Sequence, residues 1–194
     1  MPCGIIGKKY GMSRIFQEDG TVVPVTLVKC ETNVVYSLKN KSKDGHDACV
    51  LATAPEKHPT KTKKFRIIKE FALFGEDKNK GDEVSVSDFK DVKFVSIIGI
   101  SKGKGFQGVI KRHKFSRGPT THGSDHHRAP GSIGANAMPG RVIKGKKLPG
   151  RMGTDKITLK KIEVVKIYPE DNLIALKGSL PGARNTIIQI IVTK

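Results

Sequence analysis

The sequence of 194 residues predicts a mainly β protein, a small barrel interrupted by a long, basic, irregular arm, with one minor helical element. Two observations lead to this prediction. Short segments rich in Val and Ile recur along the chain with turn residues close between them, which is typical of small barrels. Residues 100–153 differ sharply from the rest, because they concentrate both glycine and positive charge.

Apolar residues that alternate, or that form short runs of Val and Ile, indicate strands. The predicted strands are Cys3–Gly7, residues 23–27, Asn33–Ser37, Cys49–Thr53, Val92–Ile100, Ile157–Tyr168, Leu173–Lys177 and Ile187–Val192. In the long segment 157–168 the apolar pattern changes phase after Val164, which predicts a β-bulge there. Turns are expected at residues 18–20, 42–45 and 181–182.

One helix is predicted around Lys61–Phe74. Ile67, Phe71 and Phe74 have the i, i+4, i+7 spacing of one helical face, and Gly75 follows as a stop signal. Together these elements predict a barrel body formed by residues 1–99 and 154–194, with a small insertion at about 55–82. Residues 100–153 form the arm, which is a long excursion between two strands of the body.

The arm is a region of extreme charge. It contains twelve Lys and Arg but a single carboxylate, Asp125, so it contributes +11 of the net charge of +18. Between Ser116 and Arg141 the only large apolar side chains are Ile133 and Met138, too few to offset the entropy of ordering the segment alone. We therefore expect an arm that becomes ordered on a folded nucleic acid; the alternative is a disordered, solvated linker.

Lys and Arg neutralise phosphates, His can donate to phosphate or 2′-hydroxyl oxygens, and Gly lets the backbone approach a ligand closely. The predicted RNA-binding side chains are Lys102, Lys104, Lys111, Arg112, Lys114, Arg117, His122, His126, His127, Arg128, Arg141, Lys144, Lys146, Lys147 and Arg151. The glycines predicted to allow close approach are Gly103, Gly105, Gly131, Gly134 and Gly140.

Several other classes of protein fit the sequence poorly. No apolar run approaches the roughly 20 residues of a membrane span, and the N-terminus does not resemble a signal peptide. The three cysteines are scattered, which argues against a zinc site or a disulfide framework and fits a reducing compartment. The GxGxxG match at residues 103–108 lacks the crossover helix of a dinucleotide site. We expect no metal, cofactor, small-molecule substrate or membrane partner.

The histidines of the arm raise an alternative function. His122, His126 and His127 lie near Asp125, so an RNA-processing enzyme that uses the His122–His127 cluster is conceivable. A two-metal nuclease needs several carboxylates, and Asp125 is alone in the arm. A further alternative is a DNA-binding protein without sequence preference. RNA binding without catalysis is the favoured hypothesis.

Three ordered blocks carry a family resemblance: Ser101–Arg112, residues 127–134 (HRAPGSIG) and residues 139–153 (PGRVIKGKKLPGRMG). They resemble the bacterial form of the large-subunit ribosomal protein three family, and residues 7–26 and 177–182 fit as well. The resemblance covers nearly the whole chain and is densest at 99–153.

The resemblance implies a six-stranded barrel of the translation-factor type and a cytoplasmic structural protein of the large ribosomal subunit, not an enzyme. It implies primary binding near the 3′ end of the 23S-type rRNA and nucleation of subunit assembly. The tip of the arm, about Gly131–Lys144, would reach toward the peptidyl transferase centre. The implied protein neighbours are the large-subunit proteins numbered fourteen and nineteen.

Overall fold

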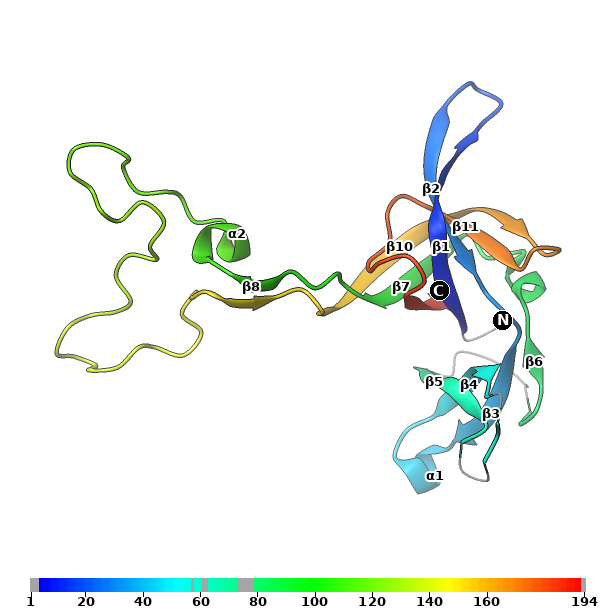
Figure 1. The fold of residues 1–194 in the computed structure, drawn as a ribbon. Helices are drawn as coiled ribbons and strands as arrows, with labels where there is room; N and C mark the ends of the chain where they lie inside the picture. Colours follow the sequence, from blue (N-terminus) through cyan, green and yellow to red (C-terminus); the bar gives the residue numbers. More distant parts are fainter. Residues whose placement is uncertain (1–3, 57, 61–62, 73–78, 193–194) are drawn as a thin grey trace. The chain divides into compact units, whose positions relative to one another are not determined.

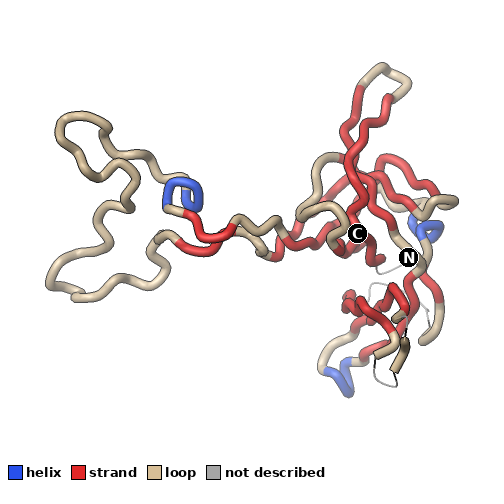
Figure 2. The backbone as a smooth tube through the Cα atoms, in the orientation of Figure 1, coloured by secondary structure: helices blue, strands red, loops and turns tan. Residues whose placement is uncertain are grey.

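The computed structural model describes residues 4–56, 58–60, 63–72 and 79–192. The chain divides into two compact units (Figures 1 and 2). The first comprises Met1–Ser101 and Lys156–Lys194, and the second comprises Lys102–Asp155. None of the helices in the described part of the chain has the length and apolar character needed to span a bilayer.

The first unit contains a closed barrel of six antiparallel strands, which confirms the predicted mainly β fold. Around the barrel the strands follow the order β1 (Gly4–Phe16), β12 (Ile187–Val192), β7 (Phe94–Ile100), β10 (Lys156–Tyr168), β11 (Leu173–Lys177) and β2 (Val22–Lys29). Closure leaves no exposed sheet edge where the six strands pair, because each strand has a partner on both sides.

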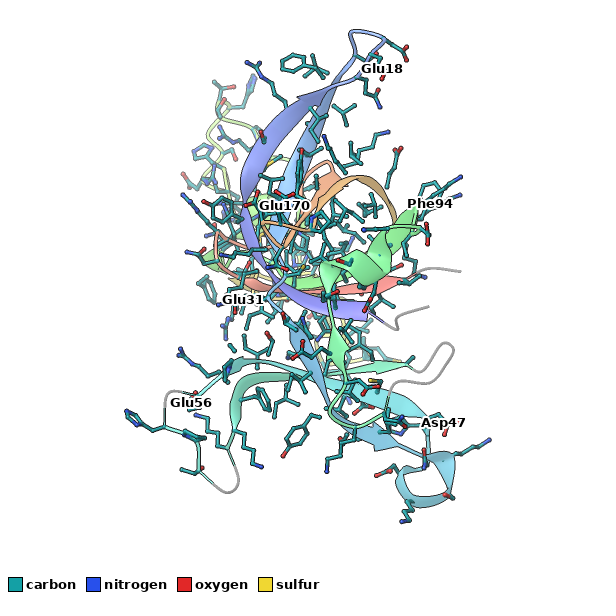
Figure 3. The ribbon with its side chains drawn as sticks, turned by 90° about the vertical axis from the view of Figure 1, so that its right-hand side faces the viewer. Glu18, Glu31, Asp47, Glu56, Phe94 and Glu170 are labelled. Atoms are coloured by element: carbon teal, nitrogen blue, oxygen red, sulfur yellow. The ribbon has the colours of Figure 1, made fainter. Side chains whose placement is uncertain are left out.

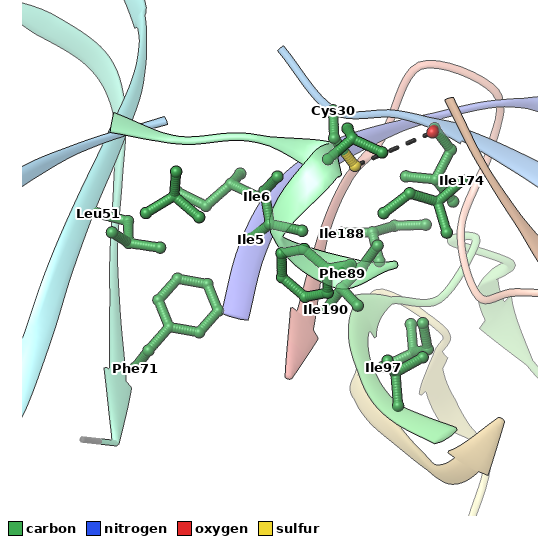
Figure 4. Close-up of a cluster of buried hydrophobic side chains, with 14 of the residues drawn as sticks. Ile5, Ile6, Cys30, Leu51, Phe71, Phe89, Ile97, Ile174, Ile188 and Ile190 are labelled. Atoms are coloured by element: carbon green, nitrogen blue, oxygen red, sulfur yellow. Dashed lines mark hydrogen bonds between the residues drawn. The ribbon is translucent and has the colours of Figure 1, made fainter. Parts of the chain in front are cut away.

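The barrel core follows from period-2 alternation along the strands. In β12, Ile188 and Ile190 are fully buried, and in the neighbouring β7 Val95 and Ile97 are fully buried. Figure 4 shows these isoleucines packed with side chains from other elements, including Phe89. Burying each such side chain contributes about 1.5–3 kcal/mol, so this cluster dominates the stability of the unit.

The predicted bulge in β10 is confirmed. The register between β10 and β11 shifts between Val164 and Lys166. A second irregularity, which the sequence pattern did not predict, lies between Leu159 and Ile162, where Lys161 has φ of 55°. Both bulges lie in β10, a 13-residue strand that pairs with β11 along one part and with β7 along another, and a bulge lets such a strand bend.

A second sheet in this unit corrects the predicted helix. Its order is β5 (Phe65–Ala72), β4 (Ala48–Pro55), β3 (Asn33–Lys39) and β6 (Glu83–Val84). The segment predicted as helical is thus the strand β5, paired along its length with β4; the ends of that prediction, 61–62 and 73–74, lie outside the described residues. Ile67 and Phe71 are four residues apart, a spacing that places them on one face of a strand as well as of a helix.

In the part of the chain that the structure describes, helical structure is confined to short elements outside β5. The first unit has α1 (Lys41–Asp44) and the 3-10 helix η1 (Val86–Phe89), and the second has α2 (Val109–His113). The turn expected at residues 42–45 falls on the end of α1, which is followed by Gly45 in the left-handed conformation. This is the usual way for a helix to end at glycine.

One buried polar side chain links the second sheet to the barrel. Asn33, at the start of β3, is fully buried, and its Oδ1 accepts a hydrogen bond from the Ile6 amide at 3.2 Å. Its Nδ2 donates to the Ile6 carbonyl at 3.1 Å and to the Glu31 carbonyl at 2.8 Å. The amide therefore completes the hydrogen bonding of β1 where that strand enters the core, as a buried polar group must.

Glu70 of β5 forms an exposed cluster of charges with Lys39 and His46. The Lys39 ammonium donates to Glu70 Oε2 at 2.6 Å, and His46 Nε2 lies 2.5 Å from Glu70 Oε1. The hydrogen bond from Lys39, followed by that from His46, lowers the pKa of the Glu70 carboxyl group.

The depressed pKa of Glu70 gives a testable pH dependence. The pKa of Glu70 is lower in the folded than in the unfolded chain. Its ion pairs therefore stabilise the fold fully at a pH above the unfolded pKa, and this stabilisation is lost as the pH falls through the folded pKa. An NMR titration of the Glu70 carboxyl should have a midpoint below that of an ordinary glutamate. In Lys39→Ala the midpoint should rise; an unchanged midpoint would contradict this account.

Candidate nucleic-acid interface

The base of the second unit is a small folded element, which we call the root. Strand β8 (Gly105–Gln107) pairs antiparallel with β9 (Gly150–Met152), and the Lys104 amide extends the pairing by donating to the Met152 carbonyl at 2.9 Å. Helix α2 follows β8 directly and buries Val109, which is 2% exposed. The GxGxxG segment thus belongs to the antiparallel strand pair β8–β9 and not to a parallel βαβ unit.

Two adjacent side chains clamp the root by binding a single backbone oxygen. The Arg112 guanidinium donates from Nη1 to the Leu148 carbonyl at 2.6 Å, and His113 Nε2 lies 3.0 Å from the same oxygen. A Cβ on Gly150 would lie 2.7 Å from Arg112 Nη1, so glycine there leaves room for the guanidinium. The clamp therefore joins α2 to the segment that leads into β9, across 36 residues of sequence.

This geometry makes a prediction about Arg112. Arg112→Gln should weaken RNA binding with little change in the salt slope, and should speed hydrogen exchange of the Lys104 amide about tenfold, because a hydrogen bond from a charged group is lost. The matched control is Lys111→Gln, since Lys111 is exposed on the same helix. That control should flatten the salt slope by about 0.7–0.9 and leave the exchange rate unchanged. The reverse pattern would show that Arg112 itself contacts phosphate.

A second closure lies farther along the arm. The Gly118 amide donates to the His127 carbonyl at 3.1 Å, and His127 Nδ1 lies 2.8 Å from the Pro119 carbonyl. A Cβ on Gly118 would collide with the carbonyl oxygen of His126. Residues 118–127 therefore form a closed loop, and the His127 ring is one of the groups that hold it shut.

The other cationic side chains predicted to bind RNA are open to solvent. The predicted Lys and Arg residues are all exposed except Arg112, which is half-buried. Within the described residues none of them forms an ion pair like those of Lys39 with Glu70 and Lys177 with Glu163 in the first unit. Unpaired ammonium and guanidinium groups retain their full attraction for phosphate.

The glycines predicted to allow close approach differ in why glycine is needed there. Gly105, Gly131 and Gly140 have φ values of 67–75°, a conformation that other residues rarely adopt. Gly103 is restricted by space, because a Cβ there would meet Thr154 Oγ1 at 3.0 Å, whereas at Gly134 the nearest atom would be 3.8 Å away.

The histidines are not gathered into a metal site. Among the described residues no three His, Cys, Asp or Glu side chains are grouped so that they could hold a metal ion. His122 and His126 are exposed, and His127 is engaged with Pro119 as described.

Cys30 is buried as a free thiol, and burial raises its pKa well above the ordinary value, which makes it unreactive.

Some surface features of the arm were missed by the sequence analysis. Phe106 is 77% exposed and pairs across the hairpin with Arg151. Met138 is 87% exposed and Ile143 is 64% exposed. The signal for Phe106 was an aromatic residue directly after the Gly- and Lys-rich segment 102–105, a composition that places a flat ring near cations.

A small closed β-barrel with an inserted segment of exposed, unpaired cations defines a class: basic proteins suited to bind a polyanion such as RNA. Comparison with known proteins identifies the family. The family model described as Ribosomal protein L3 matches residues 60–171. The chain is 46% identical over 199 residues to "Large ribosomal subunit protein uL3" of Dehalococcoides mccartyi strain 195, covering 96% of each chain.

Proteins of the same name from strains BAV1 and CBDB1 of that organism are each 45% identical over 199 residues. Identity at this level over nearly the whole length identifies the family to which the chain belongs. The chain belongs to the ribosomal protein L3 family.

Proposed function

We propose that the chain is a structural constituent of the large ribosomal subunit in the cytoplasm, where its arm binds large-subunit 23S-type rRNA. It acts by holding RNA in place and not as an enzyme. The observation that carries the proposal is the set of exposed cations in Lys102–Asp155, which have no carboxylate partner in the described structure. Membership of the L3 family supports the choice of rRNA as the polyanion.

The geometry divides the arm residues by role. Arg112 and His127 act as positioning residues, since both bind backbone oxygens within the arm. The exposed cations act as phosphate ligands, and Phe106 offers a ring on which a base can stack. Recognition rests mainly on RNA shape and 2′-hydroxyl groups, because side chains cannot read the base edges in the deep, narrow major groove of an RNA helix.

The finer details of the proposal come from the family resemblance. The protein binds early, near the 3′ end of the rRNA, and nucleates subunit assembly. The tip at about Gly131–Lys144 extends toward the peptidyl transferase centre, and the large-subunit proteins numbered fourteen and nineteen are neighbours. The exposed character of every residue from 125 to 147 supports an RNA-covered tip.

The first test uses Arg128, an exposed residue next to the closed loop. Arg128→Ala should weaken binding to a structured rRNA fragment and reduce the salt slope by about one unit, as expected for one lost phosphate contact. Lys43→Ala is the control, because Lys43 is exposed on α1 in the first unit. A slope unchanged in Arg128→Ala, or equally reduced in both variants, would argue against a specific contact at Arg128.

A further inference from the structure

The β1–β2 hairpin presents a row of exposed apolar side chains that the RNA-binding arm does not explain. Met12 is 57% exposed, Phe16 is 65% exposed and Val22 is 47% exposed. The register pairs Phe16 with Val22 and Arg14 with Pro24, so these side chains share one face, which we call the hairpin face. Exposed apolar side chains gathered on one face, unlike single scattered ones, mark interaction sites in soluble proteins.

The hairpin face is not needed for folding of the hairpin. On the opposite face Val23 and Val25 are buried against Ala175 of β11, with the half-buried Ile15 beside them. The pairing of β2 with β11 covers only Val25–Lys29, so the end of the hairpin pairs only with itself in the described structure. One side of this ribbon therefore supplies the packing, and the other is left open.

Two arginines complete the exposed surface. The Arg14 guanidinium lies 5.6 Å from the ring centre of Phe16, and the Arg184 guanidinium lies 5.4 Å from that of Tyr10, which is 47% exposed at the base of the row. Among the described residues neither arginine has a carboxylate within 4.0 Å. Tyr, Phe, Met and Arg are the residues enriched at protein–protein interfaces, where Lys is depleted.

The charge of the hairpin distinguishes a protein from an RNA partner. Residues 10–24 contain Arg14, Glu18 and Asp19 and no lysine, which gives −1 in a chain whose net charge is +18. Even with Arg184 included, the surface has no net positive charge. Glu18, at the hairpin tip in Figure 3, would repel phosphate. The surface therefore lacks the charge that phosphate binding requires.

We propose that the hairpin face is a docking surface for another protein of the large subunit. The partner presents apolar side chains to Met12, Phe16 and Val22, a carboxylate to Arg14 or Arg184, and a Lys or Arg to the acidic turn at Glu18 and Asp19. This inference rests on the proposed function, because the partner is met within the assembled subunit.

The test places the photo-crosslinking residue p-benzoylphenylalanine at position 12 or, as a control, at position 13 of the full chain expressed in cells. Ser13 is also exposed but lies on the opposite face of the same strand. Large subunits are isolated and irradiated, and adducts of the chain are identified by mass spectrometry. We expect position 12 to give a dominant adduct with one other subunit protein, and position 13 to give much less of it.

A second measurement uses Met12→Ser combined with Phe16→Ser, both at exposed positions. The double variant should enter subunits normally, and the partner identified by cross-linking should bind at least about tenfold more weakly, as is typical for loss of interface anchors. Adducts only with RNA, only with a second copy of this chain, or equally from both positions would overturn the inference while leaving the proposed function intact. Failure of the chain to enter large subunits at all would overturn both.

Discussion

Replacing residues 116–147 with a short glycine–serine linker is expected to lower affinity for a structured large-subunit rRNA fragment by about a thousandfold or more, toward non-specific binding. The deleted segment carries six Lys and Arg against the single Asp125. If each cation contacts one phosphate, the slope of log K against log salt should flatten by about four to five units. Binding measured across a salt series tests both numbers.

The linker is designed to leave the root intact. Because His113 and Arg112 both contact the Leu148 carbonyl, the chain on either side of the deletion is already held close together. A full-length variant with the same six residues changed to Gln separates charge from shape. That variant should share the flattened slope; wild-type affinity in it would show that phosphate contacts are not what the arm contributes.

Phe71→Ala is expected to lower the free energy of unfolding of the first unit by about 3–5 kcal/mol, the usual cost of removing a buried aromatic ring. Phe71 is 1% exposed and belongs to the main core cluster (Figure 4). A Cβ built on Gly4 would lie 2.6 Å from the Phe71 ring, which shows how closely β1 packs against it. The tightly packed neighbours therefore cannot move far enough to fill the cavity that the ring leaves in Phe71→Ala.

Ile68→Ala is the matched control for this substitution. Ile68 lies on the same strand but is 44% exposed, so its loss should cost less than about 1 kcal/mol. Urea denaturation followed by circular dichroism measures both variants. Equal destabilisation would mean that the second sheet contributes to the core through its backbone pairing and not through Phe71.

Most strands of the barrel could be predicted because short runs of branched apolar residues indicate strands, but β1 (Gly4–Phe16) extends well beyond the predicted Cys3–Gly7. Leu173–Lys177 and Ile187–Val192 have the predicted bounds, since both are short runs rich in branched residues. Residues 65–72 could not be assigned in this way. An apolar pair four residues apart fits both periods, and the pairing with β4 that selects the strand is not encoded in the pattern of residues 65–72 itself.

The charge of the candidate interface could be predicted from composition, but the roles within it could not. Arg112 looks like any other cation of the arm until its contact with the Leu148 carbonyl is seen. A backbone oxygen carries no sequence signal, and the same holds for the Pro119 carbonyl bound by His127. Sequence therefore predicts which groups attract phosphate, and tertiary geometry decides which of them remain free to do so.

The arm begins and ends on paired strands of the barrel, with Ile100 opposite Lys156 in the ladder between β7 and β10. For the barrel, the whole intervening segment is equivalent to the loop of a hairpin, and longer loops add little to the entropy cost of closure. The connection between β7 and β10 is thus a position where a whole segment can be inserted or replaced during evolution. A homologue could gain, lose or trade the segment between these two residues while inheriting the same barrel, and a designer could graft the segment onto another antiparallel strand pair.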